Sequence, residues 1–245
     1  MASARPVVHA LIPAAGRGER FGGAVLKQYL PIAGKPVLAH AIEAVNLYPE
    51  VSGITVVLAG DDRMFAQSID TRSRGFNTVT GGASRAESVM NGLKSIRMNH
   101  PETEWVLVHD AARPCLPRKC VTELLEQGLN SPDGAILAMP VRDTLKQSGD
   151  DSHIDGTVDR DDLWAAQTPQ LFPMDSLFDA LESMLESGAS PTDEAGAMEQ
   201  AGARPLLVMG SPANIKITWP DDVVIAEAWF ASMAESEPVA DMGKE

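Results

Sequence analysis

Strands and helices alternate along the first 140 residues of this chain, and no other feature restricts its fold as strongly. Helical patterns begin at Pro36 and at Ser84, where Glu87 completes a capping box, and two more cover Asp61–Ser68 and Val121–Leu129. Runs rich in apolar and β-branched residues predict strands at Val7–Ile12, Gly53–Ala59, Asn77–Thr80, Trp105–His109 and Gly134–Val141. This alternation predicts an α/β fold with a doubly wound, mostly parallel sheet, in which ligands bind beyond the carboxyl ends of the strands.

A polar segment interrupts the alternation at Arg142–Gln167. Turn signals at Ser148–Asp151 and Asp155-Gly156 separate short β-prone pieces, which predicts an extended β-hairpin arm at about residues 142–167. Further helices are predicted at Pro173–Glu186, Thr192–Gln200 and Asp221–Ala234, and further strands at Pro205–Met209 and Ala213–Thr218. We expect one domain over residues 1–234, including the arm, and a disordered acidic tail at residues 235–245.

The loop after the first strand combines glycines with cations. Gly16 and Gly18 let backbone N–H groups approach a phosphate because no Cβ is in the way, and Arg20 and Lys27 supply positive charge. The loop is not a dinucleotide fingerprint, because Phe21 stands where the third glycine belongs, and no Lys follows its last glycine as a Walker loop requires. We therefore interpret it as a loop that binds a nucleotide triphosphate.

Two later motifs fall at the same edge of the predicted sheet. Gly81-Gly82 follows one strand, and Asp110 follows another within the run VHDAARP, with Arg113 close enough to reach an anion. A carboxylate that faces a phosphate loop is a typical ligand for Mg²⁺, which takes one or two carboxylates together with substrate phosphates. The sequence thus predicts one shared site with Asp110 as the metal ligand, where another divalent cation would also fit.

Composition limits the partners of the protein. The formal net charge is −14, which argues against nucleic acid as a partner. No apolar run approaches the roughly 20 residues that span a bilayer, so no membrane partner is expected. Cys115 and Cys120 make neither a disulfide framework nor a zinc set, which favours a reduced, cytoplasmic location.

The motifs of this chain, taken together, resemble a known family. They are PAAGRGERF at Pro13, KQYL at Lys27, GGASRAESV at Gly81, VHDAARPC at Val108, PVRDT at Pro140, TVDR at Thr157, TPQ at Thr168, TDEA at Thr192 and NIKIT at Asn214. In this order they resemble the 2-C-methyl-D-erythritol 4-phosphate cytidylyltransferases, over nearly the whole chain. Each motif is weak alone, and the ordered set is specific.

The resemblance implies a Rossmann-like nucleotidyltransferase fold and a reaction. The family joins CTP to the 4-phosphate of methylerythritol, a sugar-alcohol phosphate, and releases pyrophosphate in the presence of Mg²⁺. The nucleophile is a phosphate oxygen that is already anionic, so positioning and electrostatic stabilisation matter more than a general base.

The resemblance also implies roles for individual residues. The positions that match the nucleotide site are Pro13, Ala14, Ala15, Gly16, Gly18, Gly81, Gly82, Arg85, Ser88 and Ala111. The catalytic positions are Arg20, Lys27, Arg160 and Lys216, and the acceptor positions are Asp110, Arg113, Thr144, Thr168 and Thr192. In the family the arm crosses to a second subunit, so the resemblance implies a homodimer in which Arg160 and Thr168 serve the partner's site.

Other functions remain open at the level of the sequence. A cytidylyltransferase acting on ribitol 5-phosphate would share the fold and mechanism, although AARP after Asp110, TVDR and TPQ favour methylerythritol phosphate. A glycosyltransferase would carry a D-x-D metal pair, whose second Asp is replaced here by Ala112. A non-catalytic nucleotide-binding regulator is opposed by the cations around the loop.

Overall fold

A seven-stranded sheet forms the centre of the protein, in the order β11-β7-β10-β6-β1-β4-β5. The computed structural model describes residues 5–16, 26–69, 76–149 and 152–236. β10 is antiparallel to its neighbours β6 and β7, and the other pairings of the sheet are parallel. The strands are β1 (Val8–Pro13), β4 (Val51–Leu58), β5 (Phe76–Thr80), β6 (Trp105–Val108), β7 (Ala135–Pro140), β10 (Trp164–Pro173) and β11 (Leu206–Met209). The predicted α/β fold with a mostly parallel sheet is confirmed.

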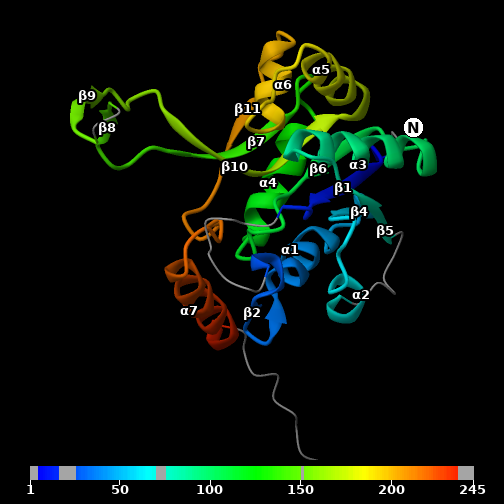
Figure 1. The fold of residues 1–245 in the computed structure, drawn as a ribbon, viewed down its shortest axis with the longest axis horizontal. Helices are drawn as coiled ribbons and strands as arrows, with labels where there is room; N and C mark the ends of the chain where they lie inside the picture. The colour runs from blue at the N-terminus through cyan, green and yellow to red at the C-terminus, as the bar shows by residue number, and fades with distance from the viewer. Residues whose placement is uncertain (1–4, 17–25, 70–75, 150–151, 237–245) are drawn as a thin grey trace, which may run out of the picture.

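Helices cover both faces of the sheet (Figure 1). Successive side chains of β1 point to opposite faces, so Ala10 and Ile12 enter one apolar cluster and Leu11 enters the other. The first cluster includes α1 (Val37–Asn46) and α4 (Arg118–Gly128). The second includes α3 (Arg85–Asn99), α5 (Met174–Glu186) and α6 (Glu194–Gln200). Both faces of the central strands are therefore buried, as in other doubly wound sheets.

The capping box predicted at Ser84 is present and fixes the start of α3. The Glu87 backbone N–H donates to the Ser84 hydroxyl at 3.1 Å, and the Ser84 N–H donates to the Glu87 carboxylate at 3.3 Å. These bonds satisfy N–H groups that the first turn of a helix otherwise leaves without partners. As a result Arg85 occupies a defined position in the first turn, beside the carboxyl ends of the strands.

A third, smaller cluster holds the C-terminal helix against the N-terminal half of the chain. α7 (Asp221–Ser236) contributes Ala226, which packs with Ile32, Val37, Cys115 and Ile217. The neighbouring short elements are η2 (Lys27–Tyr29), β2 (Pro31–Ile32), β3 (Lys35–Pro36) and α2 (Phe65–Ser68). The sequence patterns predicted neither the 3₁₀ turn at Lys27 nor the small β2–β3 hairpin. Within the described ranges, no helix combines the length and the apolar character needed to cross a membrane.

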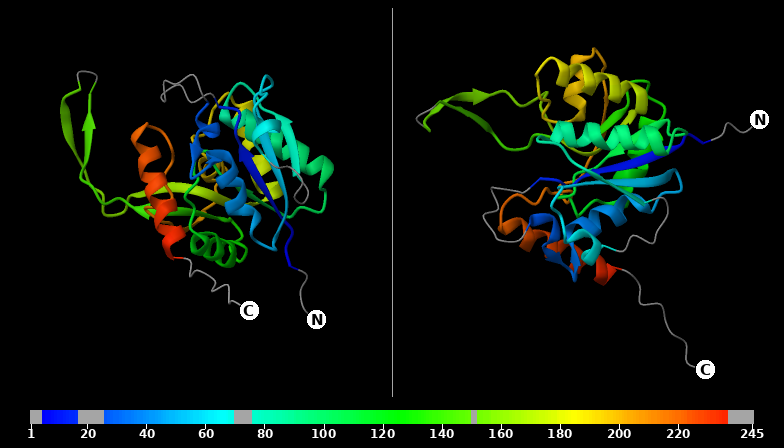
Figure 2. Two further views of the ribbon diagram at one scale, coloured as in Figure 1. Left: turned by 90° about the horizontal axis from the view of Figure 1, so that it is seen from below. Right: turned by 45° about the vertical axis from the view of Figure 1, so that its right-hand side comes forward.

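The predicted arm is present as a hairpin that projects from the sheet (Figure 2). It consists of β8 (Leu145–Ser148) and β9 (Ile154–Val158), which pair with each other in a separate two-stranded sheet. The arm ends earlier than predicted, because the Val141 N–H donates to the Leu163 carbonyl and residues 164–167 already belong to β10. Alanines and a glutamine in this stretch gave no strand pattern, yet it pairs with β7 inside the central sheet.

The predicted strand at Ala213–Thr218 is wrong. This segment begins in a turn at Ala213 and joins no sheet, and the Ile217 N–H donates to the Ala112 carbonyl at 2.8 Å. Its β-branched residues favoured a strand, but this hydrogen bond goes to the loop after β6 rather than to a strand. α7 ends two residues beyond the predicted Ala234, and residues 237–245 of the predicted tail lie outside the described ranges.

Candidate active site

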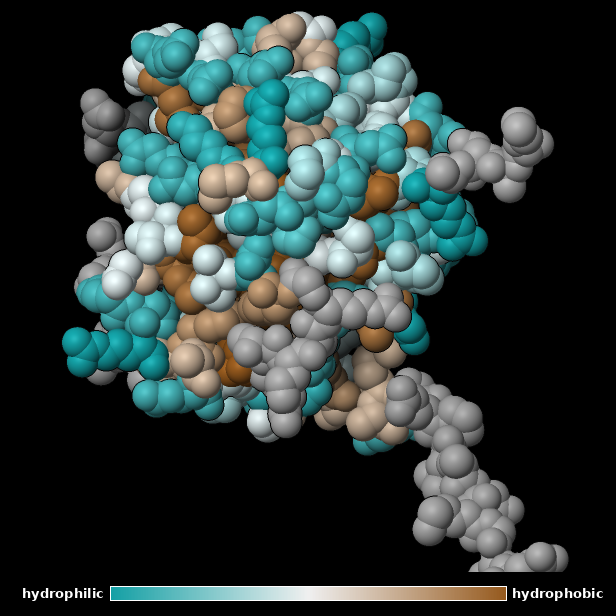
Figure 3. Space-filling model, turned by 90° about the vertical axis from the view of Figure 1, so that its right-hand side faces the viewer, coloured by the Kyte–Doolittle hydropathy of each residue, from teal (hydrophilic) through white to brown (hydrophobic). Residues whose placement is uncertain are grey.

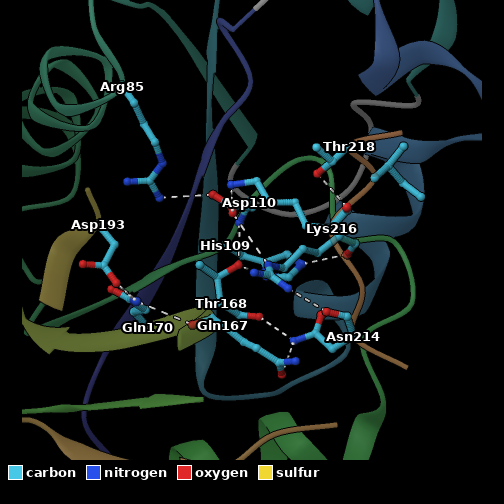
Figure 4. A network of polar contacts seen from close by, with 12 residues as sticks. Arg85, His109, Asp110, Gln167, Thr168, Gln170, Asp193, Asn214, Lys216 and Thr218 are labelled. Carbon is cyan, nitrogen blue, oxygen red and sulfur yellow. Dashed lines mark hydrogen bonds and ion pairs between the residues drawn. The ribbon is translucent and has the colours of Figure 1, made fainter. Parts of the chain in front are cut away.

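Asp110 lies at the centre of a cluster of cations, directly beyond the end of β6 (Figure 4). Its Oδ1 accepts a hydrogen bond from Arg85 Nη2 at 3.1 Å, and its Oδ2 lies 2.8 Å from Lys216 Nζ and 3.7 Å from Arg113 Nε. Burial alone would raise the pKa of Asp110, but the charges of Arg85, Lys216 and Arg113 outweigh it and hold the pKa below its ordinary value. Asp110 is therefore ionised, with both oxygens facing cations.

The backbone of Asp110 is held by β10. The Asp110 N–H donates to the Thr168 hydroxyl at 2.9 Å, and that hydroxyl lies 3.1 Å from His109 Nδ1. The Arg113 carbonyl can only accept, so His109 Nε2 donates to it at 3.1 Å. In the neutral ring Nδ1 is then the acceptor, and the Thr168 hydroxyl donates to it. Burial lowers the pKa of His109 to about 4, so the ring is neutral and both nitrogens are used in positioning neighbouring residues.

A bulge in β10 brings Thr168 to this position. Four steps along β10, from Ala166 to Gln170, face only two steps along β7, from Ala138 to Ile136. Extra residues in one strand of a pair redirect side chains, and bulges of this kind are frequent beside active sites. The buried Thr168 hydroxyl is bonded within its own chain, and its service to a partner's site, which the resemblance implies, stays a prediction.

A pocket of about 290 Å³ lies between the first loop, the start of α3 and Asp110. The predicted site residues that line it are Pro13, Ala14, Ala15, Gly16, Lys27, Gly82, Arg85, Ser88, Asp110, Ala111 and Lys216. Gly81 lies behind this lining, where a Cβ would fall 2.6 Å from the Ala15 Cβ and 2.7 Å from the Ser88 hydroxyl. Only glycine fits there, so the pocket is shaped by close backbone packing.

Side chains from the KQYL motif hold the wall of this first pocket. Gln28 is buried, and its Nε2 donates to the Ala14 carbonyl at 3.0 Å, which fixes the peptide after β1. Lys27 Nζ donates to the Ile217 carbonyl at 3.1 Å and so connects the loop to the segment that carries Lys216. Sequence reasoning assigned Lys27 but missed Gln28, although the motif was the signal that could have identified it.

A second pocket, of about 260 Å³, lies on the other side of Asp110. The predicted acceptor residues Arg113, Thr168 and Thr192 line it together with Gln167, Gln170 and Asp193, which sequence reasoning missed. Three residues line both pockets, namely Arg85, Asp110 and Lys216. The cluster around Asp110 is thus a wall between two pockets, and we call these three residues the dividing wall.

Two predicted site residues are not brought to either pocket. Thr144 and Arg160 lie exposed in the arm, where the Arg160 guanidinium donates to the Arg142 carbonyl. Gly18 and Arg20 lie outside the described residues, so the structure does not test their predicted roles. The remaining predicted residues converge from β1, η2, α3, β6, β10 and the segment before α7, as expected for the carboxyl edge of a parallel sheet.

The donor set near Asp110 fits a divalent cation that arrives with a polyphosphate. In the part of the chain that the structure describes, no three or more His, Cys, Asp or Glu side chains group as a metal cage. Among the described residues, Asp110 is the one carboxylate that lines the first pocket, beside cations suited to phosphate. Mg²⁺ is commonly bound by one or two carboxylates plus substrate phosphates, so the residues present fit that arrangement.

Comparison with known proteins agrees with this site. The sequence model of the 2-C-methyl-D-erythritol 4-phosphate cytidylyltransferase family matches residues 8–232. The chain is 49% identical over 225 residues to a protein of that name from Xanthomonas campestris pv. campestris (strain 8004), covering 92% of this chain and 85% of that protein. It is 47% identical over 217 residues to the one from Xylella fastidiosa (strain M23), covering 89% and 94%.

Solved structures give the same result. A crystal structure of 4-diphosphocytidyl-2C-methyl-D-erythritol synthase superposes with a TM-score of 0.80 at 39% identity, covering 93% of this chain and all of that one. Residues 8–232, which the family model matches, include the central sheet, the arm and both pockets. The chain belongs to the 2-C-methyl-D-erythritol 4-phosphate cytidylyltransferase family.

Proposed function

We infer that this protein transfers a cytidylyl group from CTP to 2-C-methyl-D-erythritol 4-phosphate and releases pyrophosphate. The observation that carries the chemistry is the dividing wall: Arg85, Asp110 and Lys216 line both pockets. A nucleotide in the first pocket and a sugar phosphate in the second would meet at these residues. The attacking phosphate oxygen would then reach the α-phosphorus beside one charged cluster.

The residues suit a reaction whose barrier is charge repulsion. The acceptor phosphate is a nucleophile without deprotonation, and His109 is neutral with both nitrogens engaged, so no general base is needed. Lys27 borders the first pocket, Arg113 the second, and Lys216 both. We assign Lys27 to the triphosphate, Arg113 to the acceptor phosphate, and Lys216 to the charge that develops between them.

We propose Mg²⁺ as the cofactor, with Asp110 as the residue that would hold it. When bound, the ion supplies positive charge to the phosphates of the nucleotide. Asp110 stays ionised because its cationic neighbours lower its pKa, so its carboxylate is available as an oxygen ligand. Removal of divalent cations with a chelator should stop pyrophosphate release, and added Mg²⁺ should restore it; unchanged release without metal would contradict the proposal.

We propose that the protein works as a homodimer joined through its arm. Thr144 and Arg160 are exposed in the arm and outside both pockets of their own chain, although their motifs match acceptor-binding positions. Exposed apolar side chains accompany them, with Ile154 exposed by 67%, Leu163 by 38% and Trp164 by 37%. Apolar and charged groups together on a projecting hairpin suit a contact with a second copy.

On the face that points away from the arm, hydrophilic side chains are spread across the surface, with apolar groups between them (Figure 3).

The net charge of −14 argues against a nucleic-acid partner, and we expect the protein to act in the cytoplasm without a membrane partner. Buried, unpaired Cys115 and Cys120 are consistent with a reducing compartment.

The test is pyrophosphate release from purified protein with CTP, Mg²⁺ and 2-C-methyl-D-erythritol 4-phosphate. Controls replace the acceptor with ribitol 5-phosphate and CTP with ATP, GTP or UTP. We expect release only when CTP is combined with the methylerythritol substrate in the presence of Mg²⁺. Release with ribitol 5-phosphate instead would move the acceptor while keeping the mechanism, and no release with any pair would overturn the assignment of catalysis.

A further inference from the structure

Glu194 is a buried carboxylate to which the proposed mechanism gives no role. It is 1% exposed and lies at the first position of α6, in the TDEA motif. Its Oε1 accepts from Arg85 Nη1 at 2.7 Å and its Oε2 accepts from Arg85 Nη2 at 3.0 Å, a bidentate ion pair. Removing a charge from water carries a large desolvation penalty, so a buried pair of this kind is weak as a stabilising device.

The Arg85 guanidinium continues from Glu194 into the dividing wall. Its Nη2 is shared between Glu194 Oε2 at 3.0 Å and Asp110 Oδ1 at 3.1 Å. A guanidinium is planar and its donors form a rigid fork, so two bonds to Glu194 determine the direction in which Nη2 reaches Asp110. Glu194 therefore controls the position of a carboxylate that it does not itself contact.

Glu194 is in turn held from β10. Gln170 is 1% exposed, its Nε2 donates to Asp193 Oδ2 at 2.8 Å, and its Oε1 accepts from the Ala195 N–H at 3.0 Å. One buried amide thus holds both chain neighbours of Glu194 (Gln170 and Asp193 are drawn in Figure 4). Asp193 also caps α6 by accepting from the Gly196 N–H at 3.0 Å.

These contacts close a ring. It runs from Gln170 on β10 to the start of α6, through Glu194 to Arg85 on α3, on to Asp110 after β6, and back to β10 through Thr168. The links between elements in the ring are hydrogen bonds or ion pairs; Gln170, Glu194, Asp110 and Thr168 are buried, and the Arg85 side chain is 31% exposed. Such a closed arrangement restricts the dividing wall from two sides, because β10 holds both the backbone of Asp110 and the support of Arg85.

We propose that Glu194 is a positioning residue for cytidylyl transfer, which acts through Arg85 to place the Asp110 carboxylate between the nucleotide and acceptor pockets. This inference rests on the proposed function. Without the Glu194 carboxylate, both donors of the Arg85 fork turn to Asp110, so the carboxylate shifts away from Lys216 and Arg113 toward α3. The acceptor pocket, lined by Asp110, Arg113 and Lys216, loses its arrangement of charge.

The first experiment compares Glu194→Gln with Glu199→Gln, which removes the same charge from an exposed position on the same helix. We expect Glu194→Gln to lower kcat/KM for 2-C-methyl-D-erythritol 4-phosphate by about 10- to 100-fold, as for other outer-shell partners. The KM for the acceptor should rise by more than the KM for CTP, because the shift of Asp110 away from Arg113 changes the acceptor pocket, which is the one of the two pockets that Arg113 lines. Glu199→Gln should match the wild type. The inference would be overturned if both KM values were unchanged and kcat fell only in proportion to the fraction of protein that is no longer folded.

The second experiment is a double-mutant cycle with Arg85→Gln. If Glu194 acts through Arg85, then adding Glu194→Gln to Arg85→Gln should cost less than about threefold further in kcat/KM. A full additional loss would show that Glu194 acts by another route and would overturn the inference. The double variant leaves neither charge unpaired, so its comparison with Arg85→Gln decides the matter even if Glu194→Gln alone does not fold. Inactive wild-type protein would instead count against the proposed function.

Discussion

The dividing wall and the β8–β9 arm hold their charged side chains in opposite ways. At the wall, Asp110 is 9% exposed at its side chain and has Arg85, Lys216 and Arg113 within 3.7 Å, each from a different part of the chain. In the arm, Arg160 is exposed and donates to the carbonyl of Arg142 in the same hairpin. The wall is arranged within one chain, whereas the arm presents groups that need another surface to act on.

The largest effect is expected at the dividing wall and in the adjoining first pocket. Lys216→Ala and Lys27→Ala should each lower kcat by about 10²–10³, because each removes a preorganised cation from the site of charge development. The measurement is pyrophosphate release, with circular dichroism to verify folding. Lys94→Ala, an exposed lysine on α3, is the matched control and should retain full activity. Near wild-type turnover of Lys27→Ala would remove its assigned role.

A smaller effect is expected in the arm. Arg160→Ala should weaken use of the sugar phosphate by about 10- to 100-fold, the value of a lost charge-assisted hydrogen bond, while CTP binding is retained. An unchanged KM and kcat for the acceptor would refute the role of this side chain.

Mixing two variants tests whether the arm acts on a second subunit. When equal amounts of Arg160→Ala and Lys27→Ala subunits are unfolded and refolded together, about half of the dimers are mixed. If Arg160 serves the partner, each mixed dimer contains one intact site, and activity should recover to about a quarter of the wild-type value. No recovery, in protein shown to form dimers, would place Arg160 in its own chain's site.

The cost in stability of replacing a glycine with alanine compares how tightly the sheet and the arm are packed. Gly134 has φ +76°, and a Cβ there would collide with the Leu171 carbonyl, so Gly134→Ala should cost about 2 kcal/mol or more of unfolding free energy. A Cβ on Gly156, in β9, meets nothing within 4 Å, so Gly156→Ala should change stability by less than about 0.5 kcal/mol. Urea unfolding measures both. Equal costs would mean that the arm is packed as tightly as the sheet in solution.

An effect that is confined to acidic pH concerns the stability of the fold. His9 is buried, its Nε2 lies 2.9 Å from the Thr55 hydroxyl, and burial together with His100 lowers its pKa from 6.5 to about 3. The unfolded chain takes up this proton near pH 6.5 and the folded chain does not, so stability is full above that pH and falls toward pH 3. The slope from one such group approaches about 1.4 kcal/mol per pH unit.

Substitution isolates this contribution. His9→Gln should flatten the pH dependence of the urea midpoint between pH 6.5 and 4, whereas His153→Gln, an exposed arm histidine, should leave it as in the wild type. An unchanged slope in His9→Gln would show that other groups account for acid unfolding.

Local patterns predicted most helices and strands of this fold, although not β10, and the residues near strand ends. Asp110 and Arg113 follow a strand whose apolar run is clear, and Ser84 with Glu87 marks the start of α3 without reference to the rest of the chain. Because parallel strands end at one edge, placing Asp110 opposite the glycine loop needed no knowledge of distant contacts. The arm was predicted from polarity and turn residues alone.

Contacts that depend on nonlocal pairing could not be predicted from the sequence. The position of Thr168 depends on β10 running antiparallel between β6 and β7 and on its bulge, neither of which has a local signal. Glu194 has the sequence context of an ordinary charged residue at a helix start, and its burial follows from the approach of Arg85 across the pocket. At Ala213–Thr218, β-branched residues predicted a strand, but the hydrogen bonds of this segment go to its own turn and to the loop after β6.

The bulge in β10 is a stretch of the chain that does not tolerate a change of length, in contrast to the hairpin that precedes it. Thr168 and Gln170 stand two residues apart and hold the backbone of Asp110 and the start of α6, respectively. Inserting or deleting one amino acid between them would move one of the two contacts to the opposite face of the strand. The hairpin that precedes β10 can lengthen or shorten at its tip without this effect. Among relatives, gaps in sequence alignments should therefore gather in the arm and be absent from the five residues 166–170.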